Sequence, residues 1–140
     1  MSQPISQREI LNRAWDTVER EDREGLRVLA AQTVHPDCEW IPLLSGVDGR
    51  TYHGPDGMVE FFTEWLDAFK PRYEDRGFEQ LSDDTILGTC RLRLESRETG
   101  MSMDREIALI GRFEDGLLRQ GRVYDSRSEA MDAARELRDA

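Results

Sequence analysis

Three tight-turn signals divide the second half of the chain into four segments of strand length. Ser82-Asp83-Asp84, Glu98-Thr99-Gly100 and Glu114-Asp115-Gly116 combine the small, acidic and glycine residues that are usual in short chain reversals. Connections this short join antiparallel neighbours, because a parallel crossover needs about a dozen residues or more. We therefore predict an antiparallel meander with strands at 73–81, 85–97, 102–114 and 117–124.

The second of these segments shows which face of the sheet is buried. Cys90, Leu92 and Leu94 alternate with charged residues along it. Successive side chains of a strand point to opposite faces, so this alternation indicates one apolar face and one solvated face.

The first half of the chain carries helical signals. Capping boxes at Ser6-Gln7-Arg8-Glu9 and Ser126-Arg127-Ser128-Glu129 predict one helix near each end of the chain. A second N-terminal helix is predicted to start near Asp22. A short strand is expected at 38–41, then a loop over 42–54 that includes a brief strand at 51–53.

The strongest helical pattern starts at Pro55, which suits a first helical position. Apolar residues then recur at steps of three and four until Pro71 ends the pattern. They are Met58, Val59, Phe61, Phe62, Trp65, Leu66 and Phe69. The order of elements predicts an α+β fold in which a curved sheet packs against helices on one face. With 140 residues, we expect a single domain over 1–140.

Charge and composition exclude several classes of function. The net charge of −10 disfavours nucleic acid and anionic membranes as partners. The N-terminus lacks a signal peptide and no apolar run reaches the about 20 residues of a membrane span, so a cytoplasmic location is expected. The two cysteines, Cys38 and Cys90, suggest buried free thiols. The phosphate-binding and dinucleotide motifs are absent from the sequence, so no cofactor is expected.

Three stretches resemble one known family. His35-Pro36-Asp37-Cys38-Glu39-Trp40 resembles its first strand, and Tyr52-His53-Gly54-Pro55-Asp56-Gly57 the start of its pocket-covering helix. Phe113-Glu114-Asp115-Gly116, Val123-Tyr124 and Glu129-Ala130-Met131 resemble its closing hairpin and tail. The chain is thus similar to the SnoaL-like branch of the NTF2-like superfamily. The resemblance implies a cone around an apolar pocket and a homodimer formed through the outer face of the sheet.

The superfamily contains isomerases, epoxide hydrolases, polyketide cyclases and non-catalytic binders, so the fold does not choose a reaction. The resemblance places the catalytic carboxylates of a ketosteroid isomerase at Pro42 and Leu109. It places the catalytic groups of a limonene-type epoxide hydrolase at Cys90, Leu92 and Arg122. Neither set of residues can do the corresponding chemistry.

A cyclase of this family needs mainly one acid/base carboxylate. Asp125 lies near the corresponding position and Asp37 is a second candidate, with Tyr124 as a hydrogen-bond donor. The alternative for Asp125 is a helix-capping role.

Two histidines and two carboxylates near the first predicted strand are candidate metal ligands. His35, Asp37 and Glu39 share one face of a strand, and a metal site there would also need His53. The alternative is a solvated strand edge, and no metal is expected.

Six aromatic residues are candidates for the pocket walls, with plain core packing as the alternative. They are Trp15, Trp40, Phe62, Trp65, Phe69 and Tyr124. By alternation, Arg105 faces inward if Met103 and Ile107 do, and Arg122 faces inward if Tyr124 does. The two arginines would receive an anionic ligand group. Alternatively, they pair with internal carboxylates such as Glu60 or Glu64, or the strand register places both of them outside.

These patterns predict a protein that binds a small, mainly apolar molecule, which can carry an acidic end. The alternative is an enzyme of the cyclase, isomerase or epoxide hydrolase type that uses a pocket carboxylate as acid/base. A protein-interaction module is a third reading, but the 34% charged content argues against a large exposed apolar patch.

Overall fold

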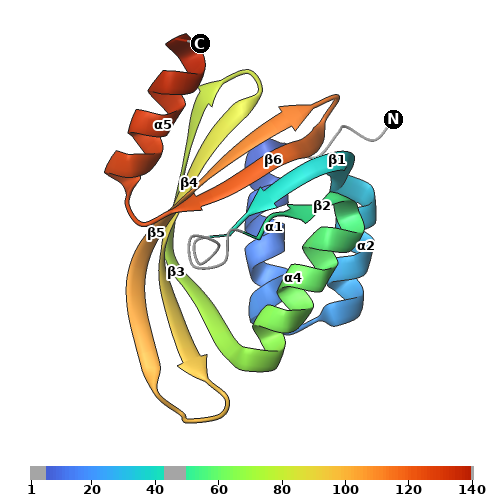
Figure 1. Ribbon diagram of the computed structural model, residues 1–140, viewed down its shortest axis with the longest axis vertical. Coiled ribbons are helices and arrows are strands. Elements are labelled where there is room, and N and C mark those ends of the chain that lie inside the picture. Colours follow the sequence, from blue (N-terminus) through green and yellow to red (C-terminus); the bar gives the residue numbers. More distant parts are fainter. Residues whose placement is uncertain (1–5, 43–49, 140) are drawn as a thin grey trace.

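The computed structural model describes residues 6–42 and 50–139. Within them, a six-stranded sheet has the order β2-β1-β6-β5-β4-β3. The elements are α1 (Gln7–Glu19), α2 (Arg23–Thr33), β1 (Val34–Ile41), β2 (Tyr52–His53), α4 (Gly54–Ala68), β3 (Phe69–Ser82), β4 (Thr85–Ser96), β5 (Ser102–Glu114), β6 (Leu117–Tyr124) and α5 (Arg127–Asp139). Figure 1 shows that the long strands curve, and that α1, α2 and α4 lie together on one side of them.

The meander predicted from the turns is confirmed. β3, β4, β5 and β6 pair antiparallel in chain order. The turns use backbone conformations that suit their residues: Asp115, Gly116 and Gly100 all have positive φ. β3 begins at Phe69, directly after α4 and earlier than predicted. The sheet therefore continues from the end of the aromatic helix without a separate loop.

The strand β1 is predicted by the sequence, but its pairing partners in the sheet are not. It pairs parallel with β6 and antiparallel with β2, and it starts at Val34 instead of the expected residue 38. The β1–β6 register breaks between Val34 and Glu39. Pro36 lies in this interval and cannot donate a ladder hydrogen bond. Beyond this break, β1 pairs regularly with β6, and Trp40 lies opposite Gly121 on the inner face of the sheet.

The predicted helix starts are confirmed by their caps. The Ser6 hydroxyl accepts from the Glu9 N–H (3.1 Å), and the Asp22 carboxylate accepts from the Gly25 N–H (2.9 Å). Ser126 accepts from the Glu129 N–H in the same way (3.1 Å). Each bond satisfies an N–H that the first helical turn leaves without an intrahelical partner.

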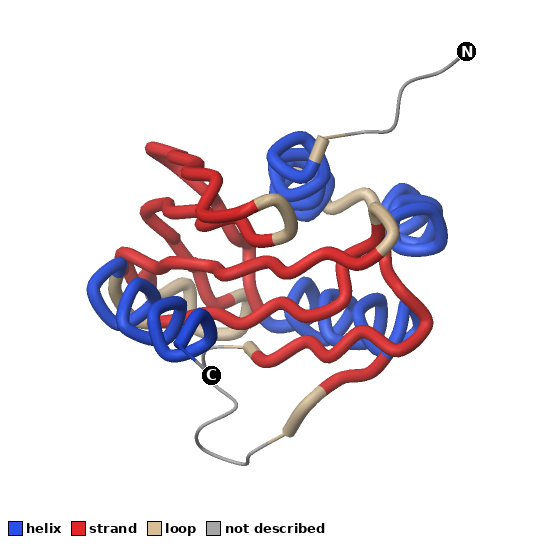
Figure 2. The backbone as a smooth tube through the Cα atoms, turned by 90° about the horizontal axis from the view of Figure 1, so that it is seen from above, coloured by secondary structure: helices blue, strands red, loops and turns tan. Residues whose placement is uncertain are grey.

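The C-terminal helix corrects the expectation that the helices collect on one face. Ala130 and Ala134 of α5 pack with Leu87, Ala108 and Ile110, which form a small second core on the outer face of the sheet. Figure 2 shows helices on both sides of the strands. The apolar stretch 107–110 of β5 explains this, because it supplies buried side chains to both faces.

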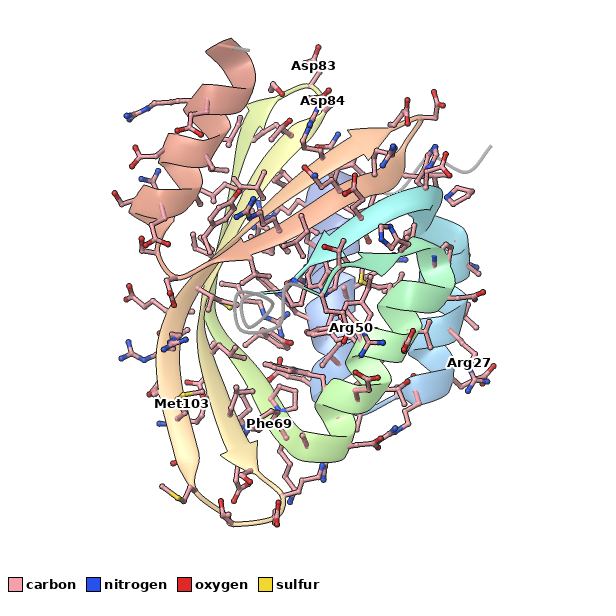
Figure 3. All side chains as sticks on the ribbon, in the orientation of Figure 1. Arg27, Arg50, Phe69, Asp83, Asp84 and Met103 are labelled. Carbon is pink, nitrogen blue, oxygen red and sulfur yellow. The ribbon has the colours of Figure 1, made fainter. Side chains whose placement is uncertain are left out.

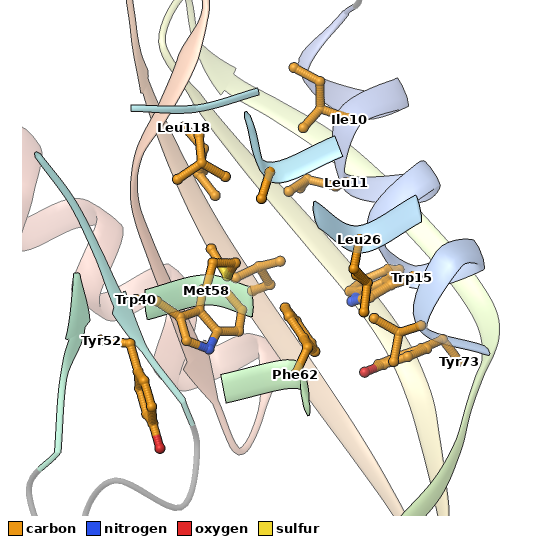
Figure 4. Close-up of a cluster of buried hydrophobic side chains, with 14 of the residues drawn as sticks. Ile10, Leu11, Trp15, Leu26, Trp40, Tyr52, Met58, Phe62, Tyr73 and Leu118 are labelled. Atoms are coloured by element: carbon orange, nitrogen blue, oxygen red, sulfur yellow. The ribbon is translucent and has the colours of Figure 1, made fainter. Parts of the chain in front are cut away.

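The main core fills the inner, concave face and is drawn in Figure 4. It joins Ile10 and Leu11 of α1 to Met58 and Phe62 of α4 and to Leu118 of β6. Among the described residues, no helix has both the length and the apolar character that crossing a membrane requires.

Candidate functional site

An apolar cavity lies between α4 and the inner face of the sheet. Its volume is about 200 Å³, which exceeds the about 150 Å³ of an engineered apolar cavity that binds benzene. All three tryptophans of the chain, Trp15, Trp40 and Trp65, line it. Figure 3 labels Phe69 and Met103, which line its end nearer the β4–β5 turn. The space suits a molecule of one or two rings.

The sheet supplies an aliphatic wall to this cavity. β4 and β5 pair with Leu92 opposite Arg105 and Leu94 opposite Met103, so these side chains share one face. The aliphatic lining residues of the two strands are Leu92, Leu94, Met103, Ile107 and Leu109. The alternation predicted for β4 is therefore present, and it forms the cavity wall.

α4 supplies an aromatic wall. Phe61 and Trp65 lie four residues apart, and their rings stack at 5.6 Å with an interplanar angle of 26°. Phe69 continues the row, 5.2 Å from Trp65. Gly54 fixes the start of the helix: its φ is 69°, and a Cβ there would lie 2.9 Å from the Pro36 carbonyl oxygen. The aromatic row is thus anchored against β1.

Trp40 closes the cavity from β1. It lies opposite Gly121 of β6, where a Cβ would fall 2.6 Å from Trp40 Cε3. Only glycine leaves room for the indole at this register position. Trp40 also contacts the rings of Phe61 and Phe62 at 5.8 and 5.7 Å. In Figure 4, the indole nitrogen lies between the Tyr52 and Phe62 rings, both of which line the same cavity.

Among the described residues, two buried side-chain donors have no hydrogen-bond partner. The indole N–H groups of Trp40 and Trp65 have no acceptor among the described residues. A buried donor without an acceptor costs about 1–3 kcal/mol. The Trp65 indole lies near the Tyr73 hydroxyl without reaching hydrogen-bond geometry, so Trp40 is the clearer case. Both tryptophans line the cavity, where a ligand can supply an acceptor.

Two polar side chains in the cavity wall are hydrogen-bonded to each other. The Tyr52 hydroxyl donates to Glu64 Oε2 at 3.1 Å, and both residues line the cavity. Burial, followed by this bond to the carboxylate, raises the pKa of Tyr52. Arg50 stacks over the Tyr52 ring at 4.5 Å and pairs with Glu60 at 2.6 Å. Glu60 and Glu64, the predicted alternative partners of Arg105 and Arg122, therefore pair with Arg50.

Arg105 also lines the cavity, as alternation predicted. Its guanidinium lies 3.4 Å from the Asp125 carboxylate, and the two side chains are 42% and 55% exposed. Arg105 is thus a cation at the cavity rim that retains contact with water. A long, exposed ion pair of this kind contributes little to stability, so a ligand anion can replace Asp125 at Arg105 with little loss of stability.

Arg122 and Tyr124 lie on the outer face, which corrects the alternation expected at β6. Tyr124 is paired with Ala108 and packs in the core under α5, and Arg122 lies over its ring at 5.2 Å. Burial raises the pKa of Tyr124. Val123 occupies the inner face instead and lines the cavity. The residues of β6 alone do not show whether Tyr124 or Val123 faces inward. The predicted alternation therefore assigned the inner face to the wrong set of residues.

Asp37 lies away from the cavity lining. It is exposed, its N–H donates to His35 Nδ1 at 2.9 Å, and its carbonyl accepts from Arg119. His35 Nε2 lies 3.4 Å from Glu114. No cluster of three metal-ligating side chains occurs in the part of the chain that the structure describes. Asp37 and His35 thus make contacts with each other and with nearby residues at the edge of the sheet.

The positions that the resemblance assigns to other chemistries can now be located. Pro42, Leu92 and Leu109 line the cavity, and none of them carries an ionisable group. Cys90 is buried, and burial raises the pKa of its thiol to about 12, so it remains protonated. Cys38 is similar. The cavity is thus apolar where an isomerase or an epoxide hydrolase would place its acid/base groups.

The predicted lining residues Trp15, Trp40, Phe62, Trp65, Phe69 and Arg105 all reach the cavity. Sequence reasoning missed Tyr52, Phe61 and Tyr73 as lining residues. Phe61 had a signal, since it precedes Trp65 by one helical turn. Tyr52 reaches the site because it pairs with Trp40 across β1 and β2. Tyr73 stacks on Trp15 at 5.4 Å, a long-range contact that no local pattern indicates.

No protein-family model and no curated protein matches the chain. Solved structures do. An NTF2-like protein of unknown function from Burkholderia pseudomallei matches with a TM-score of 0.68 and 22% identity, covering 89% of this chain and 94% of that one. TerC, co-crystallised with polyporic acid, matches at 0.67 and 18%, with coverages of 89% and 94%. A protein from Jannaschia sp. CCS1, provisionally assigned as a SnoaL-like polyketide cyclase, matches at 0.69 and 17%, covering 95% of each chain.

These likenesses cover nearly the whole chain at low sequence identity. They establish the fold: the protein has the NTF2-like fold found in proteins described as SnoaL-like and ketosteroid isomerase-like. The expected fold is confirmed.

Proposed function

We propose that this protein binds a small, mainly apolar molecule of one or two rings in the aromatic cavity. The observation that carries the proposal is the cavity itself, which has about 200 Å³ of space and walls of aromatic and aliphatic side chains. Protein interiors are normally packed without voids of this size, and keeping one costs stability. Ligand pockets typically combine such walls with a few polar groups.

Arg105 is the proposed anchor for an acidic end of the ligand. It is a cation at the rim, and its partner Asp125 is loosely held at 3.4 Å. A carboxylate can accept two parallel bonds from a guanidinium, which fixes orientation as well as affinity. The structural neighbour TerC was crystallised with polyporic acid, which supports an acid as ligand class for a pocket of this fold.

Calorimetry with two matched probes tests the proposal. 2-Naphthoate and 2-naphthalenemethanol share one ring system and differ in charge. We expect both to bind wild-type protein, and we expect Arg105→Ala to weaken the naphthoate about tenfold while leaving the alcohol within twofold. Equal effects on both probes would remove the anchor role of Arg105.

A blocking variant locates the binding site. Val123→Phe adds a ring inside the cavity, because Val123 lines it. Val28→Phe is the matched control on α2, where the side chain is 48% exposed. We expect only Val123→Phe to abolish binding of both probes. Binding that survives Val123→Phe in a folded variant would contradict the proposed site.

The alternative function is an enzyme of the cyclase, isomerase or hydrolase type. Tyr52 and Glu64 favour it, because they form a hydrogen-bonded acid/base pair in the wall at 3.1 Å. Asp125 at the rim is a second carboxylate, whereas Asp37 is not among the residues that line the cavity. Deuterium exchange into 2-indanone tests this: catalysed exchange that Glu64→Gln or Asp125→Asn removes would favour an enzyme, and background exchange would favour a binder.

A homodimer remains the expected assembly. The outer face beside α5 carries Arg91 and Arg93, each near Asp104 (2.9 and 3.8 Å), so the uncovered sheet surface holds both charge signs. A self-complementary surface suits a two-fold interface. Sedimentation equilibrium at low and high salt is the test, and a monomer at both would refute it.

A further inference from the structure

We infer that the Trp40 indole N–H is a fixed hydrogen-bond donor for the ligand, and that the group it recognises is the neutral carbonyl oxygen of a ring compound. This inference rests on the proposed binding function and names the group that the cavity recognises. Trp40 is 7% exposed, its N–H has no acceptor among the described residues, and it lines the cavity. A molecule that enters the cavity can supply the acceptor that this donor lacks among the described residues.

The position of this donor is set by the fold. Gly121 leaves room for the indole against β6, since a Cβ there would lie 2.6 Å from Trp40 Cε3. The Phe61 and Phe62 rings hold the other side at 5.8 and 5.7 Å. A ring confined in this way cannot turn its N–H toward bulk water without displacing its neighbours. The donor is therefore preorganised, which lowers the entropic cost of binding.

The surroundings of Trp40 favour a neutral acceptor. Beside it, the Tyr52 hydroxyl donates to the Glu64 carboxylate, and Arg50 pairs with Glu60 and Glu64. The cavity wall at Trp40 is largely apolar, and the nearby cation Arg50 is already paired with Glu60 and Glu64, so an anion held at Trp40 would be an uncompensated charge that is expensive to bury. A carbonyl oxygen carries no net charge and accepts from an N–H. Trp40 thus selects a carbonyl, while the anion of a bifunctional ligand belongs at Arg105.

The test uses indane and 1-indanone, two bicyclic probes that differ by one carbonyl oxygen. The chain has three tryptophans, so its ¹H–¹⁵N spectrum has three indole N–H signals, which single Trp→Phe variants assign. We expect 1-indanone to move the Trp40 signal downfield and indane to leave it nearly unmoved. We also expect Trp40→Phe to weaken 1-indanone about tenfold and indane less than threefold.

Trp15→Phe is the matched control, because Trp15 lines the same cavity but its indole nitrogen is not among the unpartnered atoms. It should affect both probes equally. If Trp40→Phe also affects both equally, or if the Trp40 signal responds alike to both, the carbonyl inference is overturned while ligand binding stands. If neither probe binds, the proposed function fails and the inference fails with it.

Discussion

Two places in this molecule bury polar groups beside tryptophan, and they are treated in opposite ways. Under α1, the Arg76 guanidinium lies 6.0 Å from the Trp15 ring and donates to the Tyr73 carbonyl, Asn12 and Asp16 at 2.6–2.9 Å. It also pairs with Glu19. In the cavity, the Trp40 and Trp65 N–H groups have no acceptor in the described part of the chain.

This difference distinguishes a polar cluster that stabilises the fold from polar groups that are available to a ligand. The Arg76 side chain is 16% exposed and is hydrogen-bonded to several residues. The hydrogen-bonding groups of this cluster are therefore satisfied within the protein, and the cluster stabilises the fold. Within the described residues, the two indole N–H groups lack an acceptor, and both tryptophans line the cavity. Sites that violate packing rules without internal compensation are the places to expect function.

The largest expected effect is the loss of the satisfied cluster. Arg76→Met leaves Asp16 and Glu19 without their cation, and we expect the free energy of unfolding to fall by about 2–3 kcal/mol. Arg23→Met is the control: Arg23 pairs with Asp67 at 2.9 Å on the surface, and its loss should cost less than about 0.5 kcal/mol. Urea denaturation measures both. Equal costs would mean that the Arg76 cluster is no more than a surface pair.

The second largest effect is expected at Gly121, beside the cavity. Gly121→Ala should cost about 1–3 kcal/mol and also weaken ligand binding, because the new Cβ displaces the Trp40 indole. Gly111→Ala is the control, since Gly111 pairs with Gly121 but its Cβ would meet neighbours only at 3.4–3.5 Å. Denaturation and calorimetry of both variants test this. A Gly121→Ala protein of wild-type affinity would show that the indole position is not set by Gly121.

A third prediction concerns the two buried thiols, Cys38 and Cys90. Burial raises the pKa of Cys38 and Cys90 to about 12, from 9.0 when exposed. The folded state therefore retains these protons while the unfolded state loses them, so the stability is complete below pH 9 and declines above it. At pH 10 the loss should be about 1 kcal/mol per thiol. Urea denaturation at pH 8 and 10 measures it.

Cys90→Ala provides the internal check on that prediction. It should halve the cysteine contribution to the pH dependence, whatever it does to stability at pH 8. An unchanged slope between pH 8 and 10 would show that the thiols are not its source.

The smallest expected effect is that of Trp40→Phe on the free protein. The variant loses packed atoms but also removes an unpaired buried N–H, and these changes offset each other. We expect a net change of less than about 1 kcal/mol, well below that of Arg76→Met. A large loss in urea denaturation would mean that the N–H is satisfied in the free protein, and the contrast between the two regions would disappear.

Most of the fold could be predicted from the sequence because its signals are local. Turn residues, capping boxes and the aromatic periodicity of α4 each act within a few positions, and each is confirmed. The parallel pairing of β1 with β6 and the docking of α5 could not be predicted, because they depend on contacts between distant segments.

The cavity was partly predictable for the same reason. Trp65 and Phe69 follow helical spacing, and Arg105 follows strand alternation from Met103 and Ile107. Tyr124 was placed on the wrong face because β6 has few apolar residues to fix its phase. The orientation of Trp40 depends on a glycine 81 positions away, which no pattern around either residue reveals.

The gathering of every tryptophan around one space has an optical consequence. Because Trp15, Trp40 and Trp65 all line the cavity, nearly all of the near-ultraviolet emission of the protein originates from its walls. A quinone or aromatic ketone that enters would quench this emission at van der Waals range, whereas a compound bound elsewhere would leave it unchanged. The molecule therefore carries its own label-free sensor, and a fluorescence plate can screen for the compound that it holds.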